Sequence, residues 1–179
     1  DHHLTSDTSV SGGNPDPNGN GFPEENSPTI LNLTPHNAVG IAKYATVPEL
    51  QPNGTYNVTY MLTLKNFGND TLKNVTVVDN LLAAFPDPFT YTIIAPPQTN
   101  DTLLFVNPAF DGNTNPNILI PSAGNKMYKD QRDTIIFKLN IFPHGATTAT
   151  NTAVISGIGA FSGITVSDIS TNGFNPDLN

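Results

Sequence analysis

Oxygen-bearing side chains alternate along one short stretch near the start of the chain. Asp16, Asn18 and Asn20 occupy every second position, and Gly21 follows them where a sharp turn would be needed. Calcium takes six to eight oxygen ligands, and alternate side chains of a tightly curved loop all point inward. The spacing therefore predicts a structural Ca²⁺ site, whose candidate ligands are Asp16, Asn18, Asn20, Phe22 through its carbonyl oxygen, Glu24 and Glu25.

The calcium interpretation has an ordinary alternative, because Asn-Gly and Asp-Pro pairs also make plain turns. An EF-hand loop carries a glutamate at its twelfth position, whereas Ser27 stands at that place here. Glu24 or Glu25 would then supply the carboxylate, with Asp7 as a further donor. A loop with so few negative charges would bind Ca²⁺ with a Kd of about 10⁻⁴ to 10⁻³ M. Both interpretations stay open at this point.

A second motif occurs three times, namely an aspartate followed by a threonine and an aliphatic residue. It is similar to the O-glycosylation acceptor of some Gram-negative surface proteins. The alternative is an aspartate that opens a turn before a strand, followed by a β-branched residue. The candidate glycosylation sites are Thr71, Thr102 and Thr134.

No arrangement of side chains in the sequence points to catalysis. The chain has no cysteine, and its serines lie outside the Gly-x-Ser-x-Gly pattern of a nucleophile elbow. His36 and His144 each follow a proline without an obvious carboxylate partner, and Asp79 fits a turn or a cap at a strand end. No glycine-rich phosphate-binding loop precedes a helix. We therefore expect neither a catalytic residue nor an enzyme.

Composition narrows the class of protein further. A chain of 179 residues corresponds to one domain, or to one domain and a tail. The net charge of −8, with only seven Lys and Arg, argues against nucleic-acid binding, and no apolar run is long enough to insert into a membrane. An acidic chain rich in Asn, Thr, Gly and Pro suits a secreted or surface protein. Without disulfides, such a domain needs another source of stability, and a metal ion is one candidate.

Period-two alternation dominates the sequence after about residue 39. In the run 55–66, five apolar residues from Tyr56 to Leu64 share one face of an expected strand, while Asn57, Thr59, Thr63 and Lys65 lie on the other, as in a half-buried strand. One helical turn fits 79–85. The pattern predicts an all-β, immunoglobulin-like sandwich of about seven to nine antiparallel strands after an extended N-terminal linker. The other expected strands are 73–80, 89–96, 134–142, 149–158 and 163–170, separated by turns at 52–55, 66–70, 85–88 and 111–117.

The two ends of the chain resemble each other. Residues 6–18 read SDTSVSGGNPDPN and residues 167–179 read SDISTNGFNPDLN, with eight of thirteen positions identical at one constant offset. Self-similarity at a fixed spacing is typical of a repeat array. We interpret the chain as one repeat preceded by the tail of another. The predicted divisions are the preceding tail and linker at 1–35, the repeat domain at 36–171 and the start of the next linker at 172–179.

Residues 41–81, together with 14–29, 107–113, 134–143 and 150–157, resemble a known family. That family is the conserved-repeat β-sandwich domains of large bacterial surface proteins (domain of unknown function eleven and its relatives). That resemblance implies long, secreted, tandem-repeat stalks or adhesins. Close relatives have a linker richer in aspartate, and Asn18 and Asn20 replace two of those aspartates here. The similarity rests on IAKYATVPELQPNGTYNVTYMLTLKNFGNDTLKNVTVVDNL (41–81) and on 14–29, 107–113, 134–143 and 150–157.

Two functional hypotheses follow. The first is a structural module of an extracellular bacterial stalk, adhesin or filament, in which calcium stiffens the linker between repeats. Its partners would be neighbouring copies arranged head to tail, with exchange of the strand-like segment 1–10 between copies as a variant. The second is an adhesin module that recognises a glycan or a host protein through loops such as 96–117 or through a sheet edge.

Overall fold

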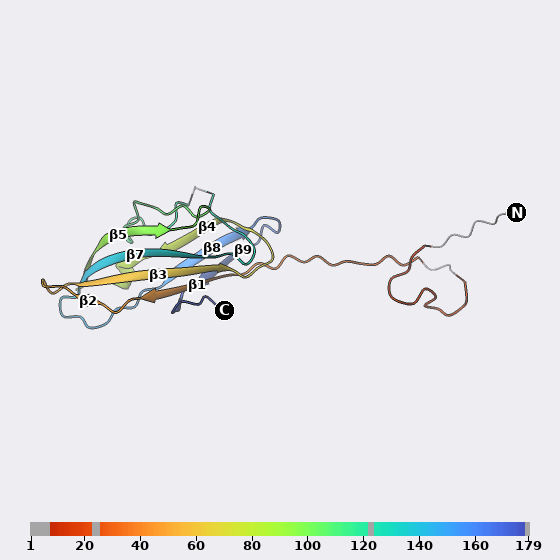
Figure 1. The fold of residues 1–179 in the computed structure, drawn as a ribbon, viewed down its shortest axis with the longest axis horizontal. Helices are drawn as coiled ribbons and strands as arrows, with labels where there is room; N and C mark the ends of the chain where they lie inside the picture. The colour runs from red at the N-terminus through yellow and green to blue at the C-terminus, as the bar shows by residue number, and fades with distance from the viewer. Residues whose placement is uncertain (1–7, 23–25, 122–123, 178–179) are drawn as a thin grey trace. The chain divides into compact units, whose positions relative to one another are not determined.

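The computed structural model describes residues 8–22, 26–121 and 124–177 of the chain. It divides into two units, Asp1–Thr34 and Pro35–Asn179. Within the described residues, strands and a helix occur only in the second unit, which Figure 1 shows as two layers of strands. The described part of the first unit consists of turns, bends and extended chain.

The larger sheet contains six strands. They are β1 (Val39–Ala45), β2 (Glu49–Leu50), β3 (Tyr56–Asn66), β5 (Thr90–Thr99), β7 (Arg132–Phe142) and β10 (Thr171–Asn172). Their order is β10-β1-β3-β7-β5, with β2 paired to the start of β3. β3 and β7, at eleven residues each, form the centre of this sheet. All pairs are antiparallel except β1 and β10, which are parallel.

The smaller sheet contains four antiparallel strands. They are β4 (Leu72–Asp79), β6 (Lys126–Met127), β8 (Ala153–Gly159) and β9 (Thr165–Ile169), in the order β6-β4-β8-β9. The single helical turn α1 (Leu81–Ala84) follows β4. Its N-cap is Asn80, whose side-chain oxygen accepts a hydrogen bond from the Ala83 N–H at 2.9 Å.

Alternating residues of the two central strands form the core between the sheets. Leu62 and Leu64 of β3 and Phe137 of β7 are at most 1% exposed. The Phe137 ring lies 5.3 Å from the Tyr60 ring and 5.5 Å from the Phe110 ring, measured between centroids. The smaller sheet contributes to the same cluster through Leu72, Val75, Val77, Ala153 and Ile155.

The predicted all-β sandwich is confirmed. Each of the expected strands overlaps an observed one, and the helical turn expected within 79–85 is α1. The described residues contain ten strands instead of seven to nine, because β2, β6 and β10 are two-residue strands that carry no periodic pattern. The parallel β1–β10 pair also departs from the expected all-antiparallel arrangement.

Candidate functional site

The predicted calcium loop curls around Asp16. The Asp16 carboxylate accepts hydrogen bonds from the backbone N–H groups of Asn20 at 3.2 Å and Gly21 at 2.9 Å. Asn18 Oδ1 accepts from the Asn20 N–H at 2.9 Å, and Asn20 Oδ1 accepts from the Phe22 N–H at 2.8 Å. Gly21 has φ of +77°, which a side chain would oppose. The local sequence therefore folds into a tight, exposed loop.

The structure brings together three of the predicted calcium ligands. Asp16, Asn18 and Asn20 all turn side-chain oxygens toward the backbone of the same loop. Each such oxygen has a second lone pair, so the arrangement is compatible with a bound cation. Within the described stretch 14–22, Asp16 is the one carboxylate, and no group of three His, Cys, Asp or Glu is found among the described residues. Glu24, Glu25 and Asp7 lie outside the described residues.

The C-terminal copy of the repeated segment is built into the sandwich. In β9, the buried Asp168 accepts a hydrogen bond through Oδ2 from the Ile41 N–H at 2.8 Å. Ser170 exchanges hydrogen bonds with the Ala153 backbone, at 2.9 Å to its Oγ and 2.8 Å from its N–H. These contacts fix the segment against strands of both sheets.

The rest of this copy lies along β1. The Gly173 N–H donates to the Lys43 carbonyl oxygen at 3.1 Å. Gly173 has φ of +120°, and its counterpart Gly12 in the N-terminal copy has φ of +106°. The Phe174 ring stacks on Tyr44 with centroids 4.0 Å apart. The two copies thus share an unusual backbone conformation at the same position.

The described part of the predicted next linker continues along the sandwich. Arg132 Nη2 donates to the Phe174 carbonyl oxygen at 2.8 Å and to Asn175 Oδ1 at 3.1 Å. A β-carbon built on Gly40 would lie 2.6 Å from the Asp177 carbonyl oxygen and 3.2 Å from Pro176 Cβ. Glycine at position 40 permits this close approach.

The three candidate glycosylation sites differ in their surroundings. Thr102 is exposed in the loop after β5, while Thr71 and Thr134 are partly buried. Thr134 lies within β7, a central strand, and is paired there with Thr63 of β3. Of the three, Thr102 has the most accessible position for a bulky sugar.

Asp101 and Asp133, which precede two of these threonines, lie close together and share a hydrogen-bond donor. Gln131 Nε2 donates to Asp101 Oδ2 at 3.0 Å and to Asp133 Oδ2 at 2.8 Å. Burial, together with the neighbouring Asp101 carboxyl, raises the pKa of Asp133 to about 6. This pair is a small acidic cluster that the linear sequence did not reveal.

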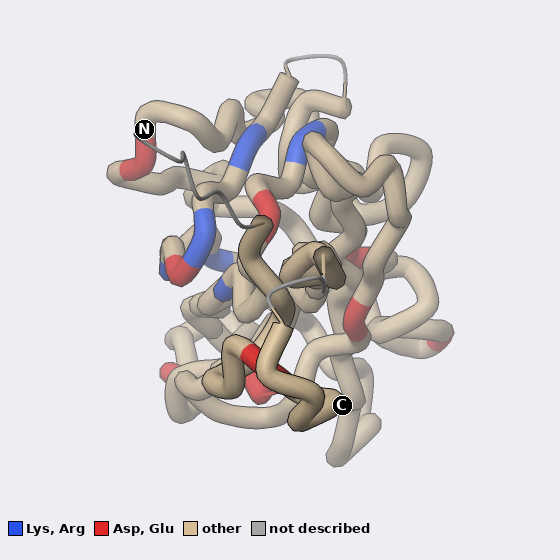
Figure 2. Tube along the Cα trace, turned by 90° about the vertical axis from the view of Figure 1, so that its right-hand side faces the viewer, with Lys and Arg blue, Asp and Glu red and all other residues tan. Residues whose placement is uncertain are grey.

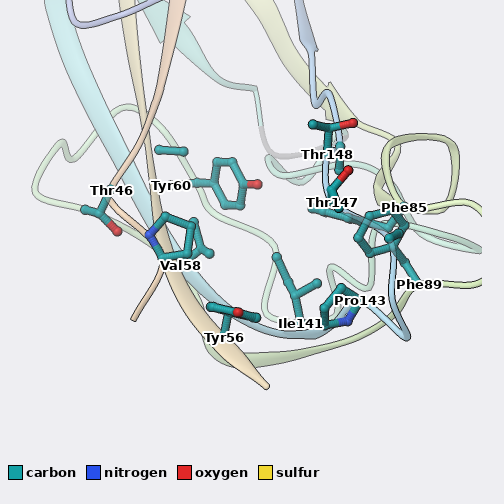
Figure 3. Close-up of a pocket in the computed structure, with 14 residues that line it drawn as sticks. Thr46, Tyr56, Val58, Tyr60, Phe85, Phe89, Ile141, Pro143, Thr147 and Thr148 are labelled. Atoms are coloured by element: carbon teal, nitrogen blue, oxygen red, sulfur yellow. The ribbon is translucent and has the colours of Figure 1, made fainter. Parts of the chain in front are cut away.

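A largely apolar pocket of about 570 Å³ opens at one end of the sandwich. Figure 3 shows Tyr56, Val58 and Tyr60 on one side of it and Phe85 and Phe89 on the other. None of the residues that line the pocket belongs to the loop 96–117, which the sequence suggested for ligand recognition. Its other lining residues are Ala45, Thr46, Pro48, Ile141, Pro143, Ala146, Thr147, Thr148 and Ala149.

A buried ion pair is the main feature that sequence reasoning missed. Lys43 Nζ in β1 donates to Asp79 Oδ2 at the end of β4, and the two residues are 5% and 0% exposed. Asp79 is therefore neither a simple turn residue nor a cap. The one signal in the sequence is a lysine inside the otherwise apolar run 39–45, where a charge would be costly without a partner.

The chain carries more acidic than basic residues, with 15 Asp and Glu against seven Lys and Arg. Figure 2 shows acidic positions at many places along the trace, with few Lys or Arg between them. No helix in the described part of the chain is long and apolar enough to cross a membrane. Comparison of the chain with protein-family models, with curated proteins and with solved structures gives no match.

Proposed function

We propose that this chain is a structural repeat module of an extracellular bacterial stalk, adhesin or filament. The observation that carries the proposal is the agreement between sequence copies and contacts. The positions identical in the two copies include those that anchor the C-terminal copy, namely Asp168, Ser170, Gly173, Asn175 and Pro176. Of the described positions that differ, Ile169, Asn172 and Phe174 are exposed and Thr171 is partly buried.

That agreement is what a tandem array requires. A segment that closes one sandwich must keep its anchoring residues in every repeat, while its exposed residues are free to change. The N-terminal copy keeps the residues that anchor the C-terminal one. It therefore fits the closing segment of a preceding repeat, followed by a linker into the next domain.

Exchange of the two copies tests this proposal. A variant that gives 167–177 the sequence of 6–16 changes Ile169→Thr, Thr171→Val, Asn172→Ser and Phe174→Gly. It should fold, and its Tm should fall by a few degrees, because the lost Tyr44–Phe174 stacking is worth about 0.5–1.5 kcal/mol. Circular dichroism shows whether the variant is folded, and its change during heating gives the Tm.

A matched control changes four anchors instead. The variant Asp168→Ala/Ser170→Ala/Gly173→Ala/Pro176→Ala removes two side-chain hydrogen-bond partners and strains the positive φ of Gly173. It should lose far more stability than the exchanged variant. Equal losses in the two variants would contradict the proposal, since the anchors would then have no special role.

Calcium is the proposed stiffener of the linker. A linker rich in Gly, Asn and Pro is flexible without an ion, and a cation held at Asp16, Asn18 and Asn20 would restrict it. The Phe22 carbonyl oxygen and the carboxylates of Glu24 and Glu25 complete the proposed ligand set. Neighbouring sandwiches would then keep a fixed separation from each other.

Titration calorimetry with CaCl₂ on the full chain tests the calcium site. We expect one Ca²⁺ bound with a Kd of about 10⁻⁴ to 10⁻³ M, and loss of that binding in Asp16→Ala. Asp177→Ala, which removes the equivalent carboxylate from the C-terminal copy, should bind as the unaltered chain does. Binding that survives Asp16→Ala, or no binding at all, would leave the loop a plain turn.

Ligand recognition is the second candidate function. The observation that favours it is the open pocket between Tyr56, Tyr60 and Phe89, whose aromatic faces suit a sugar ring or an apolar side chain. In this second candidate function, the ligand would bind at the end of the sandwich and not at the loop 96–117.

A further inference from the structure

Three polar side chains from distant parts of the sequence gather between the two sheets. Lys43 lies in β1 of the larger sheet, Asp79 ends β4 of the smaller sheet, and Asn151 comes two residues before β8. Lys43 Nζ contacts Asp79 Oδ2, and its ammonium lies 5.0 Å from the ring centroid of Tyr60 and 5.9 Å from that of Phe137. The amine is therefore held in one place, away from water.

Unpartnered polar atoms concentrate around this cluster. Five buried side-chain N or O atoms of the described residues have no hydrogen bond of normal geometry, and four of them lie here. They are Asp79 Oδ1, both side-chain atoms of Asn151, and Thr171 Oγ1. Buried polar groups are almost always satisfied, so four exceptions in one place call for an explanation.

Asn151 is close to the ion pair without being aligned to it. It lines a pocket of about 420 Å³ together with Lys43, Tyr60 and Thr171. Burial raises the pKa of both Tyr60 and Asp79, and the Asn151 carboxamide opposes each rise, although neither of its polar atoms completes a hydrogen bond of normal geometry. The carbonyl carbon of Asn151 is thus an amide electrophile beside a buried amine.

Burial sets the protonation of the pair. Burial lowers the pKa of Lys43 to about 8 against the opposing effect of Asp79, and burial raises the pKa of Asp79. Both shifts favour transfer of the proton from the amine to the carboxylate. The neutral pair consists of a nucleophilic amine in contact with a carboxylic acid.

We propose that Lys43 and Asn151 form an intramolecular isopeptide bond, with Asp79 as the proton shuttle. Lys43 Nζ attacks Cγ of Asn151, while the Asp79 carboxyl donates a hydrogen bond to the carboxamide. The attacking nitrogen then gives a proton to Asp79, and Asp79 returns a proton to Nδ2. The Cγ–Nδ2 bond breaks, ammonia leaves, and a secondary amide remains with Asp79 in its starting state.

Asn151 fits the acceptor role better than Asp79 does. A direct Lys43–Asp79 amide would consume the acid that contacts the amine, and it would leave both polar atoms of Asn151 without a hydrogen-bond partner. The Lys43–Asn151 bond uses all three groups and joins the larger sheet to the smaller one. It also supplies a covalent crosslink to a chain that has no cysteine.

The mass of the full purified chain under denaturing conditions tests the proposal directly. We expect a mass lower than that of the sequence by one ammonia, and a branched peptide joining Lys43 to Asn151 after digestion. The full sequence mass would overturn the proposal. Loss of one water, with the crosslink mapped to Lys43 and Asp79, would also overturn it. So would loss of one ammonia with Lys43 found in a linear peptide, because that result indicates a succinimide and not a crosslink.

Variants test the role of each group. Asn151→Ala and Lys43→Met should restore the full mass expected for their sequences, because each removes one partner. Asp79→Asn keeps both partners without the acid and should also show no loss of ammonia, whereas a retained loss would overturn the shuttle role. Lys138→Met, a change at a lysine of β7 outside the cluster, should keep the loss. Circular dichroism checks that each variant is folded. If a variant fails to fold, the mass of the unaltered chain and its branched peptide still decide whether the bond exists.

Discussion

The Asp79→Ala variant should unfold with a free energy about 3–5 kcal/mol lower than that of the unaltered chain. The substitution leaves Lys43 buried beside Tyr60 and Phe137 without its carboxylate partner. An uncompensated buried charge costs more than the pair itself contributes, so the stranded ammonium alone accounts for this loss of about 3–5 kcal/mol. Loss of the proposed Lys43–Asn151 crosslink would add to that cost. Urea unfolding followed by fluorescence or circular dichroism measures the difference.

The double variant Lys43→Met/Asp79→Leu is the matched control for this prediction. It replaces both charges with apolar side chains and should regain the part of the lost stability that comes from the stranded charge, about 3–5 kcal/mol. Neither variant can form the proposed crosslink, so the difference between them reports the stranded charge alone. Equal stability of the two variants would show that the charge of Lys43 is not responsible.

The pH dependence of Asp79→Ala follows from the same charge. Burial lowers the pKa of Lys43 to about 8 even with Asp79 present, and loss of Asp79 removes the effects that raise it. In the unfolded chain the pKa of lysine is about 10.4. Between the folded and unfolded values the unfolded state binds more protons, so the stability of Asp79→Ala should rise with pH. The double variant should show no such rise.

Phe137→Ala should lower the free energy of unfolding by about 3–5 kcal/mol. The ring is 1% exposed at the centre of the core, where it packs against Tyr60 and Phe110. Truncation removes the apolar contacts and leaves a cavity that two long central strands cannot close. The same unfolding measurement gives the value.

Phe161→Ala provides the comparison, because this ring is 90% exposed. Its free energy of unfolding should stay within about 0.5 kcal/mol of that of the unaltered chain. A loss of similar size in the two variants would mean that the space between the sheets is not the main source of stability.

Strand positions are easiest to predict from the sequence where one face of the strand is buried and the other is exposed. β3 and β7 show this alternation, and their positions were apparent from the pattern alone. β1 was not assigned as a strand, because its first five residues are all buried and no alternation is left to detect. The two-residue strands could not be predicted, since they depend on pairing with distant segments.

The same limit applies to the candidate sites. The curled loop around Asp16 is local, so its shape follows from nearby Asn and Gly residues that the sequence displays directly. Lys43, Asp79 and Asn151 are far apart in the sequence, and only the packing of one sheet on the other brings them together. Asp79 in particular has the sequence context of an ordinary strand end, and only its contact with Lys43 distinguishes it.

The close approach at Gly40 has a mechanical consequence. The chain enters the sandwich along β1 and, at Pro176 and Asp177, runs beside the start of that same strand. In a tandem array, tension would therefore act first on the contacts between β1 and the segment 171–177 and would not stretch the sandwich along its length. With Lys43 joined to Asn151, residues 44–150 could not be drawn out at all. Each module would then extend by a short, fixed distance and return when the load is removed.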